Sequence, residues 1–222
     1  TQTMRGSPFI KPFEERVGAW ERQLINMQEI FDEWLSCQKV WLYLEPIFGS
    51  DDIMRQMPTE GRRFAAVDAL WRKTMALAVR TPSVLRICTT DKLLEKFREA
   101  NKFLEMIQKG LNEYLDTKRL AFPRFYFLSN DELLEILSQT KNPLAVQPHL
   151  AKCFEGIHRL DFSDTQLILA MKSPEGERVQ FVEKLDPNEG DKKGNVEKWL
   201  VDVEEMMRES LRQIMREAVA AS

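Results

Sequence analysis

Apolar residues follow a helical spacing through the first fifth of the chain. Between residues 12 and 46 they alternate in steps of four and three, the pattern of a heptad seam. Pro12 suits the first turn of a helix, and Pro46 is expected to end it. The pattern predicts a helix of roughly 30 residues, about 45–50 Å long at 1.5 Å per residue. Its predicted inward positions are Phe13, Val17, Trp20, Leu24, Met27, Phe31, Trp34 and Trp41.

Two further amphipathic helices follow. One is predicted from Pro58 to Thr81, and the next starts near Thr90 or Asp91 and runs for roughly 28 residues, about 42 Å. The inward positions of the first are Phe64, Val67, Leu70, Trp71, Met75 and Ala78. Those of the second are Leu93, Phe97, Ala100, Leu104, Ile107, Leu111 and Tyr114. Three long helices joined by short breaks predict an elongated antiparallel bundle.

An aromatic segment, FPRFYF at residues 122–127, interrupts this pattern. Pro123 ends the preceding helix, and Ser129 with Glu132 has the spacing of a capping box that starts a new one. We call residues 122–127 the aromatic joint, and we treat it as a candidate hinge. A packed core strut is the alternative, because aromatic residues before a helix are common in ordinary cores. The candidate hinge residues are Phe122, Pro123, Arg124, Phe125, Tyr126 and Phe127.

The last hundred residues have a different pattern. Short helices are predicted through residue 160, and residues 166–172 and 178–185 alternate as two strands of a β-hairpin (166–185). A final helix starts near Asn195. The fold class is therefore mainly α, with one small β-hairpin near the C-terminal third. We expect an extended segment at residues 1–11, a long-helix subdomain at 12–121, and a second subdomain at 122–222.

Composition narrows the function classes. The chain has 222 residues, of which 43% are hydrophobic and 30% charged, with a net charge of −3. This balance supports a folded core and argues against disorder. The charges form no basic stripe, which argues against nucleic-acid binding, and no apolar run approaches the ~20 residues of a membrane span. The N-terminus has no apolar signal core.

Residues that could carry chemistry are few and scattered. Cys37, Cys88 and Cys153 are odd in number and far apart, which favours buried thiols in a reducing compartment over disulfides or a zinc site. No glycine-rich phosphate motif is present, and residues 188–194 read as a surface loop. Cys153 lies within one helical turn of His149, but the surrounding apolar spacing favours core packing. We therefore predict no catalytic residue, no cofactor and no metal site in this chain.

The amino-acid sequences of several segments resemble the linker region of dynein heavy chains, the N-terminal part of the motor domain. The strongest block is FPRFYFLSNDELLEIL, starting at Phe122. Others follow in order: residues 41–53, 104–125, 141–157, 173–179 and 196–211. The resemblance covers the chain from about Phe9 onward, and the block LSNDELLEILSQTKNPLAVQPHL is more similar to axonemal than to cytoplasmic heavy chains.

This resemblance implies a function. In that family the linker is a curved helical rod that swings across a ring of AAA+ modules and converts ATP-driven changes of the ring into a power stroke along microtubules. ATP and Mg²⁺ would then bind elsewhere in the full motor, with the ring as intramolecular partner and the microtubule reached only indirectly. The implied location is the axoneme of a cilium or flagellum. No nucleic acid or membrane partner is implied.

The resemblance also implies a contact between the hairpin tip and the ring. The candidate tip residues are Pro174, Glu175, Gly176 and Glu177, and a solvated turn is the alternative. A helical adaptor with a coiled-coil seam remains the competing function.

Overall fold

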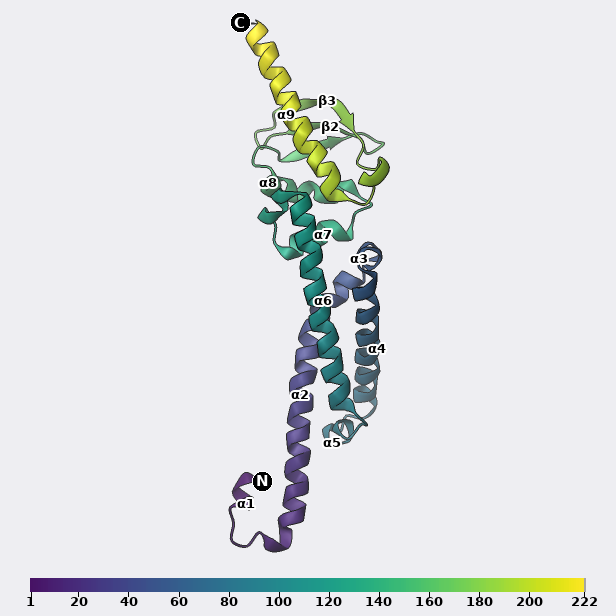
Figure 1. The fold of residues 1–222 in the computed structure, drawn as a ribbon, viewed down its shortest axis with the longest axis vertical. Helices are drawn as coiled ribbons and strands as arrows, with labels where there is room; N and C mark the ends of the chain where they lie inside the picture. Colours follow the sequence, from purple (N-terminus) through teal and green to yellow (C-terminus); the bar gives the residue numbers. More distant parts are fainter. Residues whose placement is uncertain (222) are drawn as a thin grey trace. The chain divides into compact units, whose positions relative to one another are not determined.

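A computed structural model describes residues 1–221, and it is mainly helical (Figure 1). The chain divides into two compact units. Unit 1 comprises Thr1–Gly49 and Met57–Gly110, and unit 2 comprises Ser50–Gln56 and the chain from Leu111 onward. The predicted boundary lay between residues 121 and 122. The units instead divide between Gly110 and Leu111, inside the third long helix, and Ser50–Gln56 also belongs to unit 2.

Unit 1 is built on three long helices. They are α2 (Glu14–Phe48), α4 (Pro58–Arg80) and the first part of α6 (Leu93–Ala121), with the short helices α1 (Gln2–Arg5) and α5 (Val84–Cys88) beside them. Helix α1 lies in the segment that was expected to be extended. The predicted apolar seam of α6 is confirmed from Leu93 to Leu111, because all of its members in that range are buried.

The core-facing side of α2 differs from the prediction. Buried positions recur at Ile30, Cys37 and Leu44, seven residues apart, and Trp34 stacks on Phe97 beside them with ring centroids 5.1 Å apart. The predicted inward residues Phe13, Trp20, Leu24 and Phe31 are each at least 40% exposed. Other predicted inward residues do face the core: Val17 is buried, and Trp41 stacks on Trp71. The difference is greatest at Phe31, where the buried residue is Ile30, one position earlier.

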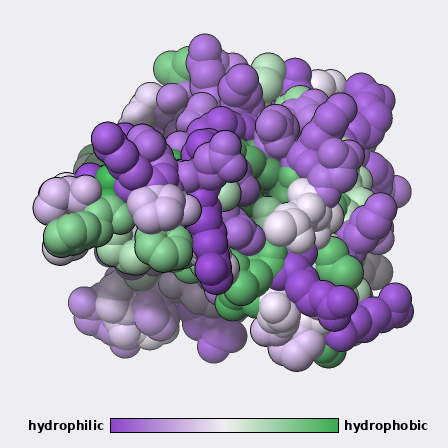
Figure 2. Space-filling view, turned by 90° about the horizontal axis from the view of Figure 1, so that it is seen from below, coloured by the Kyte–Doolittle hydropathy of each residue, from purple (hydrophilic) through white to green (hydrophobic). Residues whose placement is uncertain are grey.

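A second apolar line therefore lies on the solvent side of α2. At 100° per residue its members fall within an arc of roughly 60°. We call it the α2 stripe; it consists of Trp20, Leu24, Phe31, Leu35 and Leu42, all exposed. Figure 2 shows that apolar residues reach the surface between hydrophilic ones on the face that it draws.

Helix α2 also continues past Pro46, where it was predicted to end. A proline removes its own N–H from the ladder and its ring crowds the carbonyl four residues earlier, but it does not always end a helix. The helix runs to Phe48, and the Gly49 N–H donates to the Glu45 carbonyl at 2.9 Å.

Unit 2 contains short helices, one sheet and a long final helix. The helices are α3 (Asp51–Gln56), the end of α6, α7 (Asn130–Ser138), α8 (Leu150–Cys153) and α9 (Val196–Ala221). Short 3-10 helices cover Pro123–Phe127, Pro143–His149 and Gly190–Lys192. The capping box of Ser129 and Glu132 is present, as predicted.

The sheet has three antiparallel strands, β1 (Arg159–Phe162), β2 (Ile168–Lys172) and β3 (Arg178–Leu185), in the order β1-β2-β3. The predicted hairpin is β2 with β3. Strand β1 was not predicted, because the apolar spacing from His149 to Leu160 fits a helix. In fact α8 ends at Cys153, and Phe154 is already extended, with φ −132° and ψ 112°. Helix α9 packs on the sheet, where the Ser210 hydroxyl accepts from the Val182 N–H at 3.1 Å (Figure 1).

Candidate functional site

The aromatic joint is divided between a buried and an exposed half. Phe122 and Phe125 are fully buried, and their rings meet edge to face with centroids 5.0 Å apart. The ring of Phe122 also lies beside the ring of Phe154, with the two centroids 5.9 Å apart. Tyr126 and Phe127 are exposed by 60% and 67%. Burying a phenylalanine contributes roughly 1.5–3 kcal/mol, so the inner half of the joint is a firm part of the unit 2 core.

Two arginines brace the joint from either side. Arg124 donates to the carbonyl of Cys153 at 3.1 Å, and its Nε lies 3.2 Å from a carboxylate oxygen of Glu204 on α9. Its guanidinium also stands over the ring of Phe154, 4.9 Å from the centroid. Arg119 of α6 donates past the joint to Asn130 Oδ1 at 2.8 Å. In this conformation the joint is therefore held to α6, α7, α8 and α9 together, and its role as a hinge stays a prediction.

Two hydrogen bonds to the Glu132 carboxylate fix the N-terminus of α7, the helix that follows the joint. Glu132 Oε2 accepts from the Ser129 N–H at 3.0 Å, while Oε1 accepts from the Lys152 ammonium. The bond from Lys152 and the backbone bond from Ser129 lower the pKa of Glu132 from 4.5 to about 2. The start of α7 is thus tied to α8 by one carboxylate.

The hairpin tip is exposed at all four of its predicted residues, Pro174, Glu175, Gly176 and Glu177. Gly176 has a φ of 90°, a conformation that glycine adopts without strain, and its N–H donates to the Ser173 carbonyl at 3.1 Å. Among residues 1–221, neither Glu175 nor Glu177 has a cationic partner. The tip therefore presents two carboxylates on a hydrogen-bonded turn.

A buried polar cluster joins three helices of unit 2, and sequence reasoning missed it. Lys118 Nζ of α6 lies 2.5 Å from Glu197 Oε1 of α9, and the two side chains are only 10% and 7% exposed. The ammonium also stands over the ring of Tyr114, 5.5 Å from its centroid. The Tyr114 hydroxyl donates to Gln56 of α3, and burial raises the pKa of Tyr114.

One signal could have indicated this cluster. Lys118 follows Leu111 by seven residues, so it occupies the apolar seam of the third predicted helix. A lysine in such a position is buried only when a carboxylate meets it. The partner, Glu197, is 79 residues away, and no local pattern connects the two.

Helix α3 is also held in unit 2 by its first turn. Asp52 is buried, and its Oδ2 accepts from the Thr140 N–H at 3.1 Å and from the Thr140 hydroxyl at 2.9 Å. The Ser50 hydroxyl donates to the Ser138 carbonyl at 3.1 Å. These bonds give residues 50–56 a defined place beside the end of α7.

The thiol that lies near a histidine in the sequence is not activated. Cys153 is buried, and desolvation raises its pKa to about 11, so the thiol is protonated at neutral pH. His149 lies 3.4 Å from a carboxylate oxygen of Glu135 instead. The other two cysteines, Cys37 and Cys88, are also free and buried.

Comparison with known proteins gives a family. The family model described as "Dynein heavy chain, N-terminal region 2" matches residues 1–218. The chain belongs to this family. It is 56% identical to human dynein axonemal heavy chain 3 over 215 residues, and 56% identical to human dynein axonemal heavy chain 12 over 218. It is 52% identical to mouse dynein axonemal heavy chain 1 over 221 residues.

These matches cover 97%, 98% and 100% of this chain, but only 5%, 7% and 5% of the respective relatives. The chain thus spans a small part of the heavy chains that it matches. The resemblance drawn from the aromatic joint and the blocks around it is confirmed at the level of the family.

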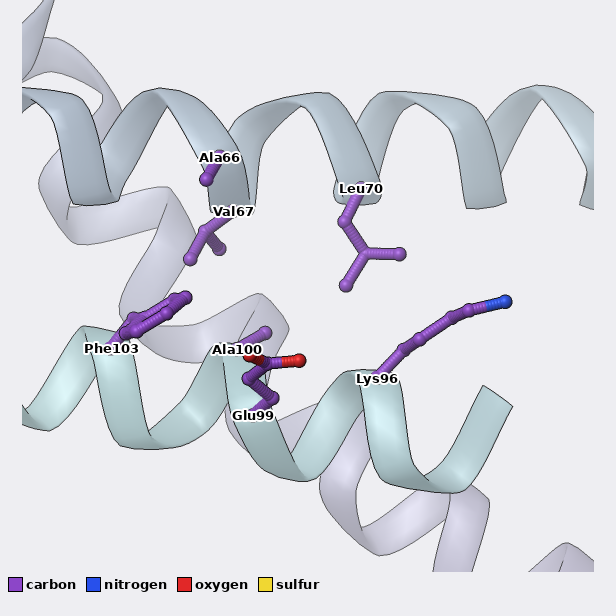
Figure 3. Close-up of a pocket in the computed structure, with 7 residues that line it drawn as sticks. All are labelled: Ala66, Val67, Leu70, Lys96, Glu99, Ala100 and Phe103. Atoms are coloured by element: carbon purple, nitrogen blue, oxygen red, sulfur yellow. The ribbon is translucent and has the colours of Figure 1, made fainter. Parts of the chain in front are cut away.

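This dynein heavy-chain segment also contains an apolar groove in unit 1. The groove has a volume of about 280 Å³ and lies between α4 and α6, where Val67 and Leu70 point toward Ala100 and Phe103 (Figure 3). Lys96 and Glu99 are the charged residues that line it. Within residues 1–221, no group of three or more His, Cys, Asp or Glu side chains is arranged to hold a metal ion. None of the helices described there is both long and apolar enough to cross a bilayer.

Proposed function

We propose that this chain is a mechanical element of an axonemal dynein heavy chain, corresponding to part of its linker. In this role it would carry force between an ATP-hydrolysing ring and the cargo-bearing end of the motor. The proposal rests on the family match over residues 1–218 and on the axonemal relatives. The ring, the microtubule and the axoneme are proposed partners and surroundings of the whole motor.

One structural observation supports the mechanical role. Helix α6 runs without interruption for 29 residues, and it supplies Leu93–Gly110 to unit 1 and the residues from Leu111 onward to unit 2. A continuous helix is held by one backbone hydrogen bond per residue, and it resists bending unless that ladder is broken. Force applied to one unit would therefore reach the other through α6.

A test can soften α6 without touching its core face. Lys109, Asn112 and Glu113 lie on the exposed side of α6, close to the unit boundary. In the full heavy chain, all three are replaced by glycine, and in a matched control by alanine. Each glycine costs about 1 kcal/mol of helix stability relative to alanine.

We expect the glycine variant to hydrolyse ATP at the normal rate but to move microtubules several-fold more slowly in a gliding assay. The alanine variant should glide normally. Equal gliding speeds of the two variants would contradict force transmission through α6. A parallel loss of ATP hydrolysis and gliding in the glycine variant would show that the segment has no separate mechanical role.

The α2 stripe favours a second candidate function, a helical adaptor. An exposed heptad-spaced stripe is the surface by which coiled-coil modules dimerise. Light scattering of the 222-residue chain discriminates between the two, because a stable parallel dimer supports the adaptor and a monomer argues against it. Replacing Leu24 and Leu35 by glutamine should dissociate such a dimer.

A further inference from the structure

A hollow of about 470 Å³ lies within unit 2, away from the aromatic joint and the hairpin tip. Residues from three segments line it: the end of α3, the loop after α7 and the loop before α9. Those that bear on its chemistry are Arg55, Gln56, Thr140, Lys141, Lys193 and Asn195. The loop before α9 was predicted to be a surface loop, and the other two segments complete the hollow around it.

The one carboxylate that lines the hollow is already occupied. Asp52 Oδ2 accepts two hydrogen bonds from Thr140, and Oδ1 accepts one from Arg55. The negative charge of Asp52 is therefore largely offset by Arg55 and by the two bonds from Thr140. Asp52 partly compensates the positive charge of Arg55. The uncompensated positive charge of the hollow therefore comes from the two lysines.

Lys141 and Lys193 have no carboxylate partner among residues 1–221, although most of the basic side chains of unit 2 have one. Both side chains are exposed, and together they place two uncompensated positive charges at the hollow. The Gln56 amide adds a donor, because its oxygen accepts from Tyr114 and its NH₂ group is left for the hollow.

The lining of the hollow includes the residues just before α9. Asn195 precedes α9, a helix of 26 residues, and the N-terminal end of a helix carries a partial positive charge. Gly194 has a φ of 77°, and an added Cβ there would lie 3.8 Å from the Thr140 hydroxyl. The loop therefore approaches Thr140 closely, and the positive end of α9 adds to the two ammonium charges.

We propose that this hollow binds a phosphate group of a small molecule, either inorganic phosphate or the phosphate chain of a nucleotide. Phosphate carries up to two negative charges and several acceptor oxygens, which suit two lysines and an amide better than one carboxylate would. A bound phosphate would link the loop after α7 to the loop before α9. The proposal does not depend on the mechanical role.

The test is calorimetric titration of the 222-residue chain with inorganic phosphate, pyrophosphate and ATP, without magnesium and at constant ionic strength. The variant is Lys141→Gln with Lys193→Gln. The matched control is Lys184→Gln with Arg212→Gln, two exposed side chains of unit 2 without a carboxylate partner among the described residues. This control removes the same total charge as the variant, but at positions that do not line the hollow.

We expect saturable binding that weakens at least tenfold in the K141Q/K193Q variant and is unchanged in the control. ATP binding at least tenfold tighter than that of pyrophosphate would identify a nucleotide, and similar affinities would identify free phosphates. The absence of saturable binding, or an equal loss of affinity in both variants, would overturn the proposal.

Discussion

At the scale of single residues, the Glu132 carboxylate makes two specific contacts. Its carboxylate caps α7 through the Ser129 N–H and holds Lys152 at the end of α8. Both contacts need the charged form, so they lower its pKa to about 2. Stability from this group is then complete above the unfolded pKa, and it disappears as the pH falls toward the folded one.

Replacing Glu132 by glutamine should therefore lower the melting temperature at pH 7. The difference from the original chain should shrink as the pH falls from about 5 to about 2, because the carboxylate becomes protonated in both states. Thermal melts over this pH range measure it. Asp131→Asn is the control, since Asp131 lies in the same first turn of α7. The same pH dependence in both variants would show that the bonds of Glu132 contribute nothing beyond a helix-terminus charge.

At the scale of elements, local patterns decided most of the fold. The seams of α4 and α6, the capping box and the β2–β3 hairpin could be predicted, because each depends on residues close in sequence. The packed face of α2, strand β1 and the Lys118–Glu197 pair could not, because each is settled by partners far along the chain. The sequence placed the helix break at residues 122–127 and the turn between β2 and β3, but not the contacts that hold the break; their roles as hinge and contact stay predictions.

The Lys118–Glu197 pair gives an element-scale prediction. Lys118→Met alone should destabilise the chain by about 3–5 kcal/mol, because it leaves the Glu197 charge buried without its partner. Adding Glu197→Leu should restore most of this stability, since the unpaired charge is then gone. Urea unfolding of the two single variants and the double variant measures the coupling. Strict additivity of the single effects would mean that the pair is not an interacting unit.

At the scale of the whole molecule, the candidate hinge and the candidate contact site have opposite surroundings. The hairpin tip is exposed and its carboxylates have no cationic partner within residues 1–221, whereas the inner half of the joint is buried and braced. The tip is therefore suited to a transient contact with a basic surface. The joint could bend only if Arg119 or Arg124 released its partners.

Reversing the tip charge should disturb the motor. In the full heavy chain, Glu175→Lys with Glu177→Lys should slow microtubule gliding several-fold, because a tip that attracts a basic surface would then be repelled. Glu205→Lys with Glu209→Lys on α9 is the control of equal charge. An unchanged gliding velocity in the tip variant would contradict the contact.

The joint can be tested with a cleavable cross-link. Cysteines at Leu120 and Asn130, both exposed, can be bridged by a reagent that spans them in this structure. If the joint is the hinge, cross-linked motors should stop gliding and recover when the bridge is cleaved. Normal gliding with the bridge intact would show that the joint is a packed core strut and not the hinge.

The placement of Ser50–Gln56 in unit 2 has a consequence for synthesis. As the chain leaves the ribosome, α3 emerges long before Thr140, which follows Asp52 by 88 residues. Lys118 of α6 likewise emerges 79 residues before Glu197. Until those residues appear, Asp52 lacks the two hydrogen bonds from Thr140, and the seam lysine of α6 lacks its carboxylate partner. Unit 2 can therefore close only after α9 has begun to emerge, and a nascent chain halted before residue 196 should be bound by chaperones.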